Sequence, residues 1–358
     1  MTQNKKTMLI INHEQFGYHT DTFQYCQYLK GEYEIIYIGF DVKREKINLD
    51  GISNIYVSAD GNYKRHFTFL KTCLTYIRQE KIDLILVKHF YFCSLLKIFS
   101  PNSKFILDIR SSAIRRSPIQ RFFMNFMILF DSLFFDRISI ISESLRKKLG
   151  IPVKKCFILP VGADILSLKS KDFKKQMRLL YVGTLSMRNI EQTIEGVYLF
   201  KKNKPADFSI QYDIIGNGSD NDKLTIQDYI RKYKLEDVVK FHGPIKYPDI
   251  QPFFDVCNVG ISYIPVTGYF NFQPPTKTFE YILSGMLCVA TATVENIKII
   301  TDQNGVLCNN NPQSFAQALE NVSANRNLWN SEVIRESRLE YVWDLIINNN
   351  LKPHLGSI

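Results

Sequence analysis

Apolar and polar positions follow a repeating order along the chain, in which a short apolar run is followed by a loop and then by an amphipathic helical pattern. In the first half, the apolar runs predict strands near residues 8–12, 34–39, 82–88, 104–108, 138–142 and 156–159. In the second half, they predict strands near residues 178–183, 209–215, 238–242, 259–263, 287–291 and 306–308. Because helical patterns stand between the strands, we expect an α/β protein with two Rossmann-like, doubly wound parallel sheets.

A polar, lysine-rich stretch without periodicity, residues 164–176, separates the two halves. We expect the boundary between the domains there, with a first domain of residues 1–170 and a second domain of residues 171–330. Residues 331–348 have the apolar spacing of one further helix, which contains Trp343. We therefore assign residues 331–358 to a separate C-terminal helical element.

The composition is that of a globular protein. A chain of 358 residues, of which 45% are hydrophobic and 13% aromatic, is long enough to bury two cores and is unlike a disordered chain. Its polar, basic start lacks the apolar segment of a signal peptide, so we expect no export. The seven cysteines are scattered without a Cys-x-x-Cys pair, which is typical of small buried residues in a reduced, cytoplasmic protein.

The sequence gives no reason to expect a metal site. The six histidines show no metal-ligand spacing. Asp220, Asn221 and Asp222 imitate a metal-binding Asp-x-Asp motif, but they stand where a helix is predicted to begin. Carboxylates at that position cap a helix and offset its dipole, which is the simpler explanation.

The most apolar stretch of the chain is residues 122–141. It is interrupted by Asn125, Asp131 and Arg137, which a bilayer-spanning helix would hardly tolerate. Its apolar residues recur at helical spacing. The sequence therefore predicts an amphipathic helix that faces the core, and docking of this helix on a membrane surface is the alternative.

Charge is distributed unequally between the halves. Residues 1–170 hold 25 Lys and Arg against 15 Asp and Glu, whereas residues 171–358 hold 20 of each, so the net charge of +10 lies in the first half. The local focus of this charge comprises Arg110, Arg115, Arg116 and Arg121, with no carboxylate between Asp108 and Asp131. Because arginine grips phosphate bidentately, we expect this group to bind an acidic acceptor or an anionic membrane surface. A solvated helix face is the alternative.

The most informative segment is residues 274–285, PPTKTFEYILSG, which an apolar run follows. Its prolines favour the start of a helix and its glycine favours the end of one. The free N–H groups of such a helix start, with Lys277 beside them, attract an anion. Glu280, one turn further on, can accept hydrogen bonds from hydroxyl groups. A phosphate next to a ribose fits these groups.

Four segments together resemble the donor-binding half of the GT-B glycosyltransferases of family 4. They are residues 179–185 with Arg188 just after them, residues 213–218, residues 239–245 and residues 274–285. Each one alone is common in α/β proteins, but their order and spacing match the family. The resemblance covers residues 178–291 and implies two Rossmann-like domains that face a central cleft, with the C-terminal helix crossing back to the first domain.

The resemblance also implies roles for individual residues. It makes Arg188 a catalytic cation at the donor diphosphate and Glu280 the ligand of the ribose, and we expect Lys277 to be the second catalytic cation there. Further donor contacts fall on Gly17, Gly183, Pro244, Ile245 and Thr276. The candidates on the acceptor side are Asp108, Arg110, Arg115 and Arg116.

The sequence departs from the family pattern at three positions. Members often have a lysine six residues after the diphosphate-binding arginine, where this chain has Ile194, so we expect Lys277 to replace it. The first of the two glutamates in the family motif is Phe272 here, which leaves the identity of the sugar open. The loop after the first strand has one glycine, Gly17, where many members have two adjacent ones.

The resemblance therefore predicts a retaining hexosyltransferase that uses a nucleotide diphosphate sugar as co-substrate and needs neither a metal nor a cofactor. The charge of the first half indicates an acidic acceptor, such as a lipid-linked glycan or a polysaccharide of the cell surface. We expect the protein in the cytoplasm, in peripheral contact with the anionic inner face of the membrane and without a nucleic acid partner. Two alternatives stay open: a non-catalytic protein that binds nucleotide-sugars or glycans, and a sugar-nucleotide epimerase with the GT-B shape.

Overall fold

The computed structural model describes residues 5–58, 61–205 and 207–356. Residues 1–4, the start of the polar N-terminal segment, lie outside the described residues. The chain forms two compact units. Gly162–Val342 make up the second unit, and the chain up to Val161 makes up the first unit together with the residues from Trp343 onward.

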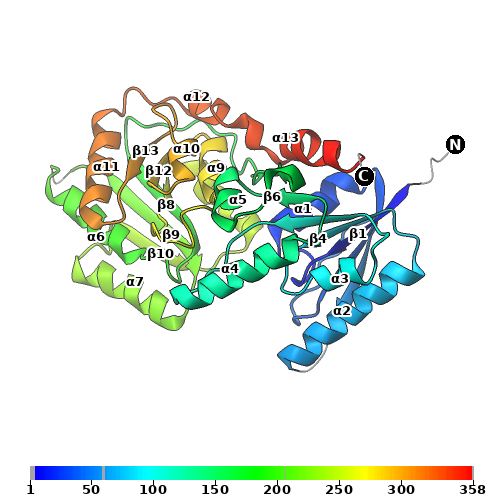
Figure 1. Cartoon of the computed structure of the whole chain (residues 1–358). Helices are drawn as coiled ribbons and strands as arrows, with labels where there is room; N and C mark the ends of the chain where they lie inside the picture. The colour runs from blue at the N-terminus through cyan, green and yellow to red at the C-terminus, as the bar shows by residue number, and fades with distance from the viewer. Residues whose placement is uncertain (1–4, 59–60, 206, 357–358) are drawn as a thin grey trace. The chain divides into compact units, whose positions relative to one another are not determined.

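The first unit is built on a seven-stranded parallel sheet with the strand order β3-β2-β1-β4-β5-β6-β7 (Figure 1). Its strands are β1 (Lys6–Ile11), β2 (Tyr33–Phe40), β3 (Ile52–Val57), β4 (Leu84–Lys88), β5 (Phe105–Ile109), β6 (Ile138–Ile140) and β7 (Cys156–Ile158). The inner strands β4 and β5 are almost entirely buried, as expected where helices cover both faces of a sheet. The apolar pattern did not predict β3, because β3 is an edge strand whose residues are mostly half-exposed.

The helices of the first unit are α1 (Thr20–Leu29), α2 (Asn62–Gln79), α3 (Ser94–Ile98), α4 (Pro118–Ser132) and α5 (Glu143–Leu149). Local signals fix where they begin. The hydroxyl group of Ser117 accepts the backbone N–H of Gln120 at the start of α4, and Pro118 supplies the first helical residue. The helix that the sequence predicts within the apolar stretch of residues 122–141 is therefore confirmed by α4.

The prediction that this segment faces the core is wrong for most of its aromatic side chains. Phe122 and Phe123 are 68% and 62% exposed, whereas the inward face carries the buried Ile128 and Asp131. Apolar residues lie on both the exposed and the buried side of α4. The spacing of apolar residues therefore could not show which side faces solvent, and the side rich in phenylalanine was wrongly predicted to face the core. Among the residues that the structure describes, no helix is both long and apolar enough to span a bilayer.

The second unit is built on a six-stranded parallel sheet with the order β10-β9-β8-β11-β12-β13 (Figure 1). Its strands are β8 (Met177–Thr184), β9 (Ile210–Asn217), β10 (Val239–Gly243), β11 (Val259–Ser262), β12 (Leu287–Thr291) and β13 (Gly305–Cys308). Its helices are α6 (Glu191–Lys202), α7 (Asp220–Lys232), α8 (Gln251–Val256), α9 (Thr276–Leu283), α10 (Asn296–Ile299), α11 (Pro312–Ala324) and α12 (Ser331–Glu336). All six strands were predicted from the sequence. The predicted capping by the Asp220–Asp222 segment is confirmed, because Ser219 and Asp222 form a reciprocal capping box at the start of α7.

The C-terminal segment is not the single helix predicted over residues 331–348. It consists of α12, a 3-10 turn (Leu339–Tyr341), α13 (Trp343–Ile346) and a π-helical turn (Ile347–Leu351). The chain is extended at Val342, which pairs with Ala163, so a continuous helix is impossible there. From Trp343 onward the chain packs in the first unit, where the Trp343 ring is buried with its centre 6.4 Å from that of Tyr25.

The polar stretch of residues 164–176 is folded onto the second unit. The hydroxyl group of Ser167 donates to Oδ1 of Asp255 at 2.7 Å, and the buried Lys171 ammonium group donates to the Ser167 hydroxyl at 3.0 Å. These contacts are polar, which is why the stretch looks like a linker in the sequence. Residues 162–170, which the sequence analysis assigned to the first domain, accordingly belong to the second unit.

Candidate active site

In each sheet the strand order reverses at one place, beside β1 in the first unit and beside β8 in the second. Open α/β sheets bind ligands at the carboxyl ends of the strands at such a place. Near the end of β8 stands Gly183, with a backbone φ of +150°, which glycine adopts most readily. A Cβ atom added to Gly183 would lie 2.6 Å from Nζ of Lys277. The missing side chain of Gly183 thus leaves the room that the lysine occupies.

Lys277 lies in the first turn of α9, and its ammonium group is buried without a hydrogen-bond acceptor among the described residues. The nitrogen lies 3.9 Å from the centre of the Tyr181 ring. Burial and the nearby Arg188 lower the pKa of Lys277 to about 7, although Glu280 acts in the opposite direction. Because a buried cation without an anionic partner is costly, this group is suited to receive an anion.

Arg188 is presented by a tight loop after β8, in which Met187 and Asn189 have left-handed backbone conformations. Its guanidinium carbon lies 3.8 Å from the centre of the Phe270 ring, and burial lowers its pKa. Arg188 and Lys277 therefore both lie against aromatic rings, which attract a cation without neutralising it. The supporting rings, Phe270 and Tyr181, were not predicted, because each comes from another segment of the chain than the cation that it contacts.

Glu280 lies one turn after Lys277, and its carboxylate and that of Asp164 both contact the hydroxyl group of Tyr247. The Tyr247 hydroxyl lies 2.9 Å from Oδ2 of Asp164 and 3.2 Å from Oε1 of Glu280. Burial raises the pKa of Glu280 to about 7, Asp164 raises it further, and burial also raises the pKa of Asp164. Since the phenol has one hydrogen to donate, one carboxylate is left able to accept a further hydroxyl group. Neither Tyr247 nor Asp164 was predicted from the sequence as a residue of the Glu280 site.

The other predicted donor contacts are more widely placed. Thr276 is the first residue of α9, and Pro244 and Ile245 follow β10 in the loop that leads to Tyr247. Gly17 is in the first unit, after β1, where its φ is +87° and an added Cβ would lie 2.4 Å from the Ile47 side chain. The structure thus brings together four of the predicted residues in the second unit, namely Gly183, Arg188, Lys277 and Glu280.

A cavity of about 550 Å³ lies at the carboxyl edge of the first sheet. Its ionisable lining comprises His13, Glu14, His66, Lys88, His89, Tyr91 and Arg115. Burial lowers the pKa of Lys88, and burial together with the charge of Lys88 lowers the pKa of His13 to about 4. Cations at the end of a parallel sheet favour an acidic ligand. Arg115 was predicted from the sequence as an acceptor-side residue and Lys88 was not, although the position of Lys88 as the last residue of β4 indicates such a role.

Two of the four acceptor-side candidates are buried in the first unit. Arg110 is 7% exposed and donates from Nε to Asp21 and from Nη1 to the carbonyl group of Leu159, both at 2.6 Å. Asp108 is fully buried, and burial raises its pKa to about 6. Arg110 was predicted to bind an acidic group together with the neighbouring arginines, but its guanidinium group already pairs with Asp21 inside the first unit. Arg116, in contrast, is exposed.

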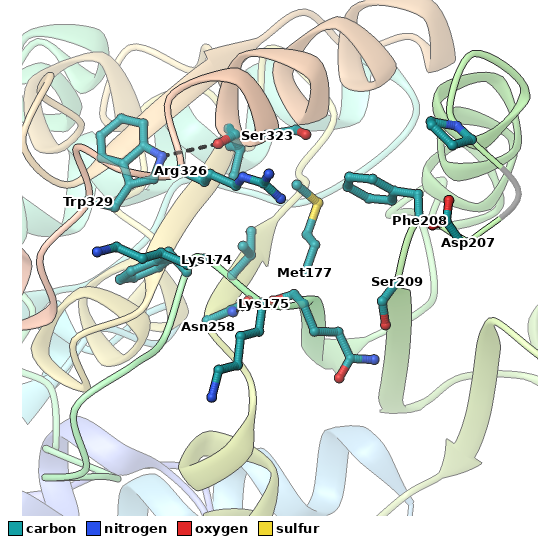
Figure 2. A pocket seen from close by; sticks show the side chains of 15 residues that line it. Lys174, Lys175, Met177, Asp207, Phe208, Ser209, Asn258, Ser323, Arg326 and Trp329 are labelled. Atoms are coloured by element: carbon teal, nitrogen blue, oxygen red, sulfur yellow. Dashed lines mark hydrogen bonds between the residues drawn. The ribbon is translucent and has the colours of Figure 1, made fainter.

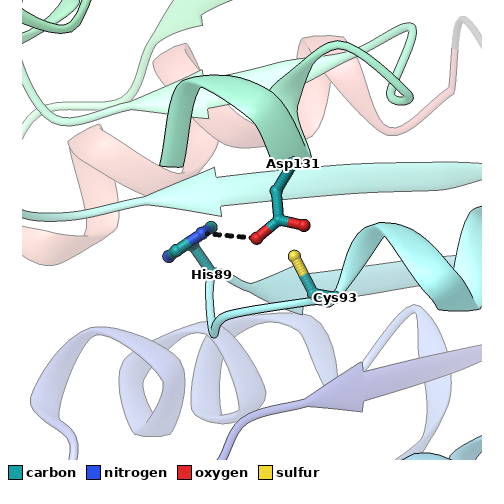
Figure 3. Close-up of side chains that lie close together, drawn as sticks. All are labelled: His89, Cys93 and Asp131. Carbon is teal, nitrogen blue, oxygen red and sulfur yellow. Dashed lines mark hydrogen bonds and ion pairs between the residues drawn. The ribbon is translucent and has the colours of Figure 1, made fainter. Parts of the chain in front are cut away.

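His89, Cys93 and Asp131 lie close together in the first unit, with their ligand-type atoms within 4.8 Å of one another (Figure 3). The Asp131 carboxylate already lies 3.2 Å from Nε2 of His89 and accepts the Ser94 hydroxyl at 2.6 Å and the Phe92 N–H at 3.1 Å. Burial raises the pKa of Cys93 well above its usual value, which keeps the thiol protonated. These bonds explain the group as a structural link between α4 and the loop after β4.

A smaller cavity of about 230 Å³ lies at the opposite, amino edge of the second sheet (Figure 2). It is lined by the starts of β8, β9 and β11 and by residues near the end of α11, including Met177, Arg326 and Trp329. The Trp329 ring donates from Nε1 to the Val322 carbonyl group at 3.2 Å. Since ligands of α/β sheets bind at the carboxyl edge, this cavity is not part of the candidate site.

Comparison with solved structures identifies the class of fold. A glycosyltransferase from Rickettsia africae is 15% identical with a TM-score of 0.75, and the match covers 98% of each chain. Sucrose-phosphate synthase from Thermosynechococcus elongatus is 15% identical with a TM-score of 0.76 over 96% of each chain. Alr3699/HepE from Anabaena, solved in complex with UDP, is 12% identical with a TM-score of 0.75 over 98% of this chain and all of the other. The fold is that of the GT-B glycosyltransferases, as predicted.

A family model adds the chemical class. Residues 176–325, which include Gly183, Arg188, Lys277 and Glu280, match the model of the Glycosyl transferases group 1. None of the curated proteins matches the sequence. The second unit thus carries a group 1 glycosyltransferase domain, and the protein is a glycosyltransferase with the GT-B fold.

Proposed function

We propose that the protein transfers a hexosyl group from a nucleoside diphosphate sugar to an acidic acceptor, with retention of anomeric configuration and without a metal or cofactor. The observation that carries the proposal is the Lys277 ammonium group, buried beside Gly183 and near Arg188 without a hydrogen-bond acceptor among the described residues. The diphosphate of a donor would supply the missing anion. Because the Anabaena relative was solved with UDP, UDP-sugars are the first donors to test.

In this proposal, departure of the nucleoside diphosphate is the step that needs help. As the bond between the sugar C1 and the phosphate oxygen breaks, negative charge grows on the diphosphate. Arg188, Lys277 and the free N–H groups at the start of α9 stabilise that charge. The acceptor oxygen forms the new bond to C1 on the same face of the sugar, and its proton passes to the leaving phosphate. This route requires no general base from the protein.

The remaining donor contacts follow from the same placement. Glu280 accepts hydrogen bonds from the ribose hydroxyl groups in this proposal, and the Tyr247 phenol keeps its carboxylate in position. Thr276 contributes its backbone N–H group at the start of α9, while Pro244 and Ile245 border the base from the loop after β10. Gly183 leaves the room in which the Lys277 side chain lies, so that its ammonium group can reach the diphosphate.

We assign the acceptor to the cavity of the first unit. Lys88 and Arg115 in its lining suit a phosphate or carboxylate group, which supports a lipid-linked glycan or an acidic polysaccharide as acceptor. A cytoplasmic enzyme of this kind would contribute to the synthesis of cell-surface glycans. Gly17, in the loop after β1, borders the same edge of the sheet and allows a close approach of the backbone.

A screen of nucleotide-sugars by thermal shift, followed by hydrolysis without acceptor, tests the proposal. We expect one donor to raise the unfolding temperature and to be hydrolysed slowly, in the presence of a chelator as well as without it. Hydrolysis that stops in chelator would contradict the metal-free mechanism. Interconversion of two nucleotide-sugars would identify an epimerase. Binding of a nucleotide-sugar without hydrolysis, and without transfer to any acidic acceptor, would identify a non-catalytic protein.

A further inference from the structure

α4 and the turn that follows it expose an unusually apolar surface. The exposed residues are Ile119, Phe122, Phe123, Phe126, Phe130, Leu133 and Phe134, which are between 37% and 70% exposed and which we call the α4 apolar face. Their spacing of mostly three or four residues places them on one side of the helix. The rings of Phe122 and Phe123 lie 5.7 Å apart and those of Phe130 and Phe134 5.3 Å apart, so neighbouring rings meet edge to face.

Such a surface is not needed for folding. The side of α4 that packs against the first unit carries Ile128 and Asp131, which are buried, and the hydrogen bonds of Asp131 fasten that side to the loop after β4. Large contiguous apolar patches on a protein surface mark places that another surface covers. The α4 apolar face therefore indicates a binding partner with an apolar layer.

The charges around the face indicate what kind of partner this is. Arg115 and Arg116 are exposed just before α4, and Arg121 in its first turns donates to both of their carbonyl groups, at 2.8 and 2.7 Å. At the other end, the Lys155 ammonium group donates to the Leu133 carbonyl group at 2.8 Å. Lys148 of α5 lies near enough to Arg121 for its pKa to be lowered, mainly by burial and further by that charge.

Negative charge near the face is sparse and engaged. The carboxylate of α4 itself, Asp131, is fully buried. The exposed Asp136, four residues after the end of α4, pairs with Lys97 at 3.8 Å. The apolar face is therefore flanked by cations at both ends, which is complementary to a bilayer whose surface carries anionic headgroups above an apolar interior.

We propose that the α4 apolar face inserts into the headgroup region of an anionic membrane, with the helix lying in the plane of the surface and its flanking cations on the lipid phosphates. Phenylalanine side chains reach the upper part of the acyl layer in this arrangement, and a helix of this length lies on the bilayer without crossing it. The binding itself does not depend on the enzymatic activity.

The proposal also deepens the proposed function. Met124 and Ile128, on the other side of α4, line the cavity that we assign to the acceptor. A helix with lipid on one side and the acceptor cavity on the other would hold that cavity at the level of the headgroups. This consequence, that the acceptor is lipid-linked, rests on the proposed function.

Vesicle binding of the full chain tests the proposal. We compare phosphatidylcholine vesicles with and without phosphatidylglycerol, in sedimentation assays that contain no donor. The parent protein should bind the anionic vesicles, and the double variant Phe122→Ser/Phe126→Ser should bind them at least about tenfold more weakly. Because both rings are exposed, the unfolding temperature should stay unchanged.

Phe67→Ser is the matched control, because Phe67 is 71% exposed on α2 in the same unit. It should bind anionic vesicles like the parent. A charge variant, Arg116→Glu, should weaken binding most at low salt, whereas the loss in the phenylalanine variant should persist at high salt.

The proposal is overturned if the phenylalanine double variant binds like the parent or if Phe67→Ser loses as much binding. It is also overturned if the parent ignores vesicles and is a dimer that the double variant converts to monomers, because a second copy then covers the face. Donor affinity is measured separately by calorimetry. Loss of donor binding with intact vesicle binding would refute the proposed function alone.

Discussion

Two buried cations, Lys277 in the second unit and Arg110 in the first, have opposite surroundings. Arg110 donates to Asp21 and to the Leu159 carbonyl group, and the nearby carboxylates raise its pKa above its ordinary value. Lys277 has a ring beneath it and no acceptor among the described residues, and burial lowers its pKa to about 7. The protein thus supplies acceptors for the buried charge of Arg110 and none, among the described residues, for that of Lys277.

This difference separates a structural charge from one that awaits a ligand. A buried charge is tolerated in a folded protein only when bonds offset its desolvation. For Arg110 these bonds are internal, and removing the charge should harm the fold. For Lys277 they must come from outside, so its removal should harm binding and turnover while the unliganded fold is unaffected.

The largest expected effect is on the stability of the first unit. Arg110→Met leaves the buried Asp21 carboxylate and the Leu159 carbonyl group without their donor, and it should lower the free energy of unfolding by about 3–5 kcal/mol. Urea denaturation measures this change. Arg231→Met, which removes an exposed pair with Asp228, is the control and should cost less than about 1 kcal/mol. Equal costs for the two variants would show that burial of Arg110 is not what matters.

The next effect is on turnover. Lys277→Met and Arg188→Ala should each reduce turnover by about one hundredfold or more, because each removes a fixed charge at the place where the leaving diphosphate becomes negative. The unfolding temperature of unliganded Lys277→Met should not fall, since the variant removes an unpaired buried charge. Steady-state kinetics on the donor and thermal denaturation measure the two quantities.

The matched control for these variants is Lys223→Met, which removes a half-exposed lysine paired with the exposed Asp220 on α7 of the same unit. It should keep parental turnover. If Lys277→Met keeps parental turnover, the Lys277 ammonium group does not bind the donor diphosphate. The difference between Lys277 and Arg110 would then have no bearing on function.

Glu280→Ala should weaken donor binding by about 2–3 kcal/mol, the scale of losing hydrogen bonds to a charged group. Titration calorimetry with a nucleoside diphosphate measures the change, and the same titration with inorganic diphosphate is the control, because it lacks the ribose. An equal loss for both ligands would place Glu280 at the phosphates. An unchanged nucleotide affinity would remove it from the site.

The fold was largely predictable, and the exceptions have physical reasons. Most of the parallel strands are buried and are continuous apolar runs. Twelve of the thirteen strands in the described residues were therefore predicted from the sequence, including the edge strands β7, β10 and β13. β3 has Ser53 and Asn54 at half-exposed or exposed positions and lacks such a run. The extended residue Val342 interrupts the predicted last helix through a pairing with Ala163, which is distant in sequence.

The candidate site was predictable only in part. Gly183, Arg188, Lys277 and Glu280 could be expected together because strand ends and helix starts meet at one edge of a parallel sheet. Their supporting partners could not, because Phe270, Tyr181, Tyr247 and Asp164 meet them through tertiary contacts that no local spacing encodes. The burial of Arg110 was hidden for the same reason.

The smallest expected effect is a change in bound protons when the nucleotide binds. At pH 8 Lys277, whose pKa is about 7 in the free protein, is mostly neutral, and a diphosphate beside it would raise that pKa again. Binding at pH 8 should therefore take up nearly one proton. At pH 6 the lysine already carries its proton, whereas Glu280, with a pKa of about 7, carries one that it should release when ribose hydroxyl groups donate to it.

Calorimetry in buffers with different ionisation enthalpies measures both numbers. The sign should reverse between the two pH values, with uptake at pH 8 and release at pH 6. Lys277→Met should abolish the proton uptake at pH 8 and retain the proton release at pH 6. Glu280→Gln should abolish the release and retain the uptake. Uptake that persists in Lys277→Met would mean that another group receives the proton. The lack of a hydrogen-bond acceptor at Lys277 would then indicate a ligand site no better than the paired charge of Arg110 does.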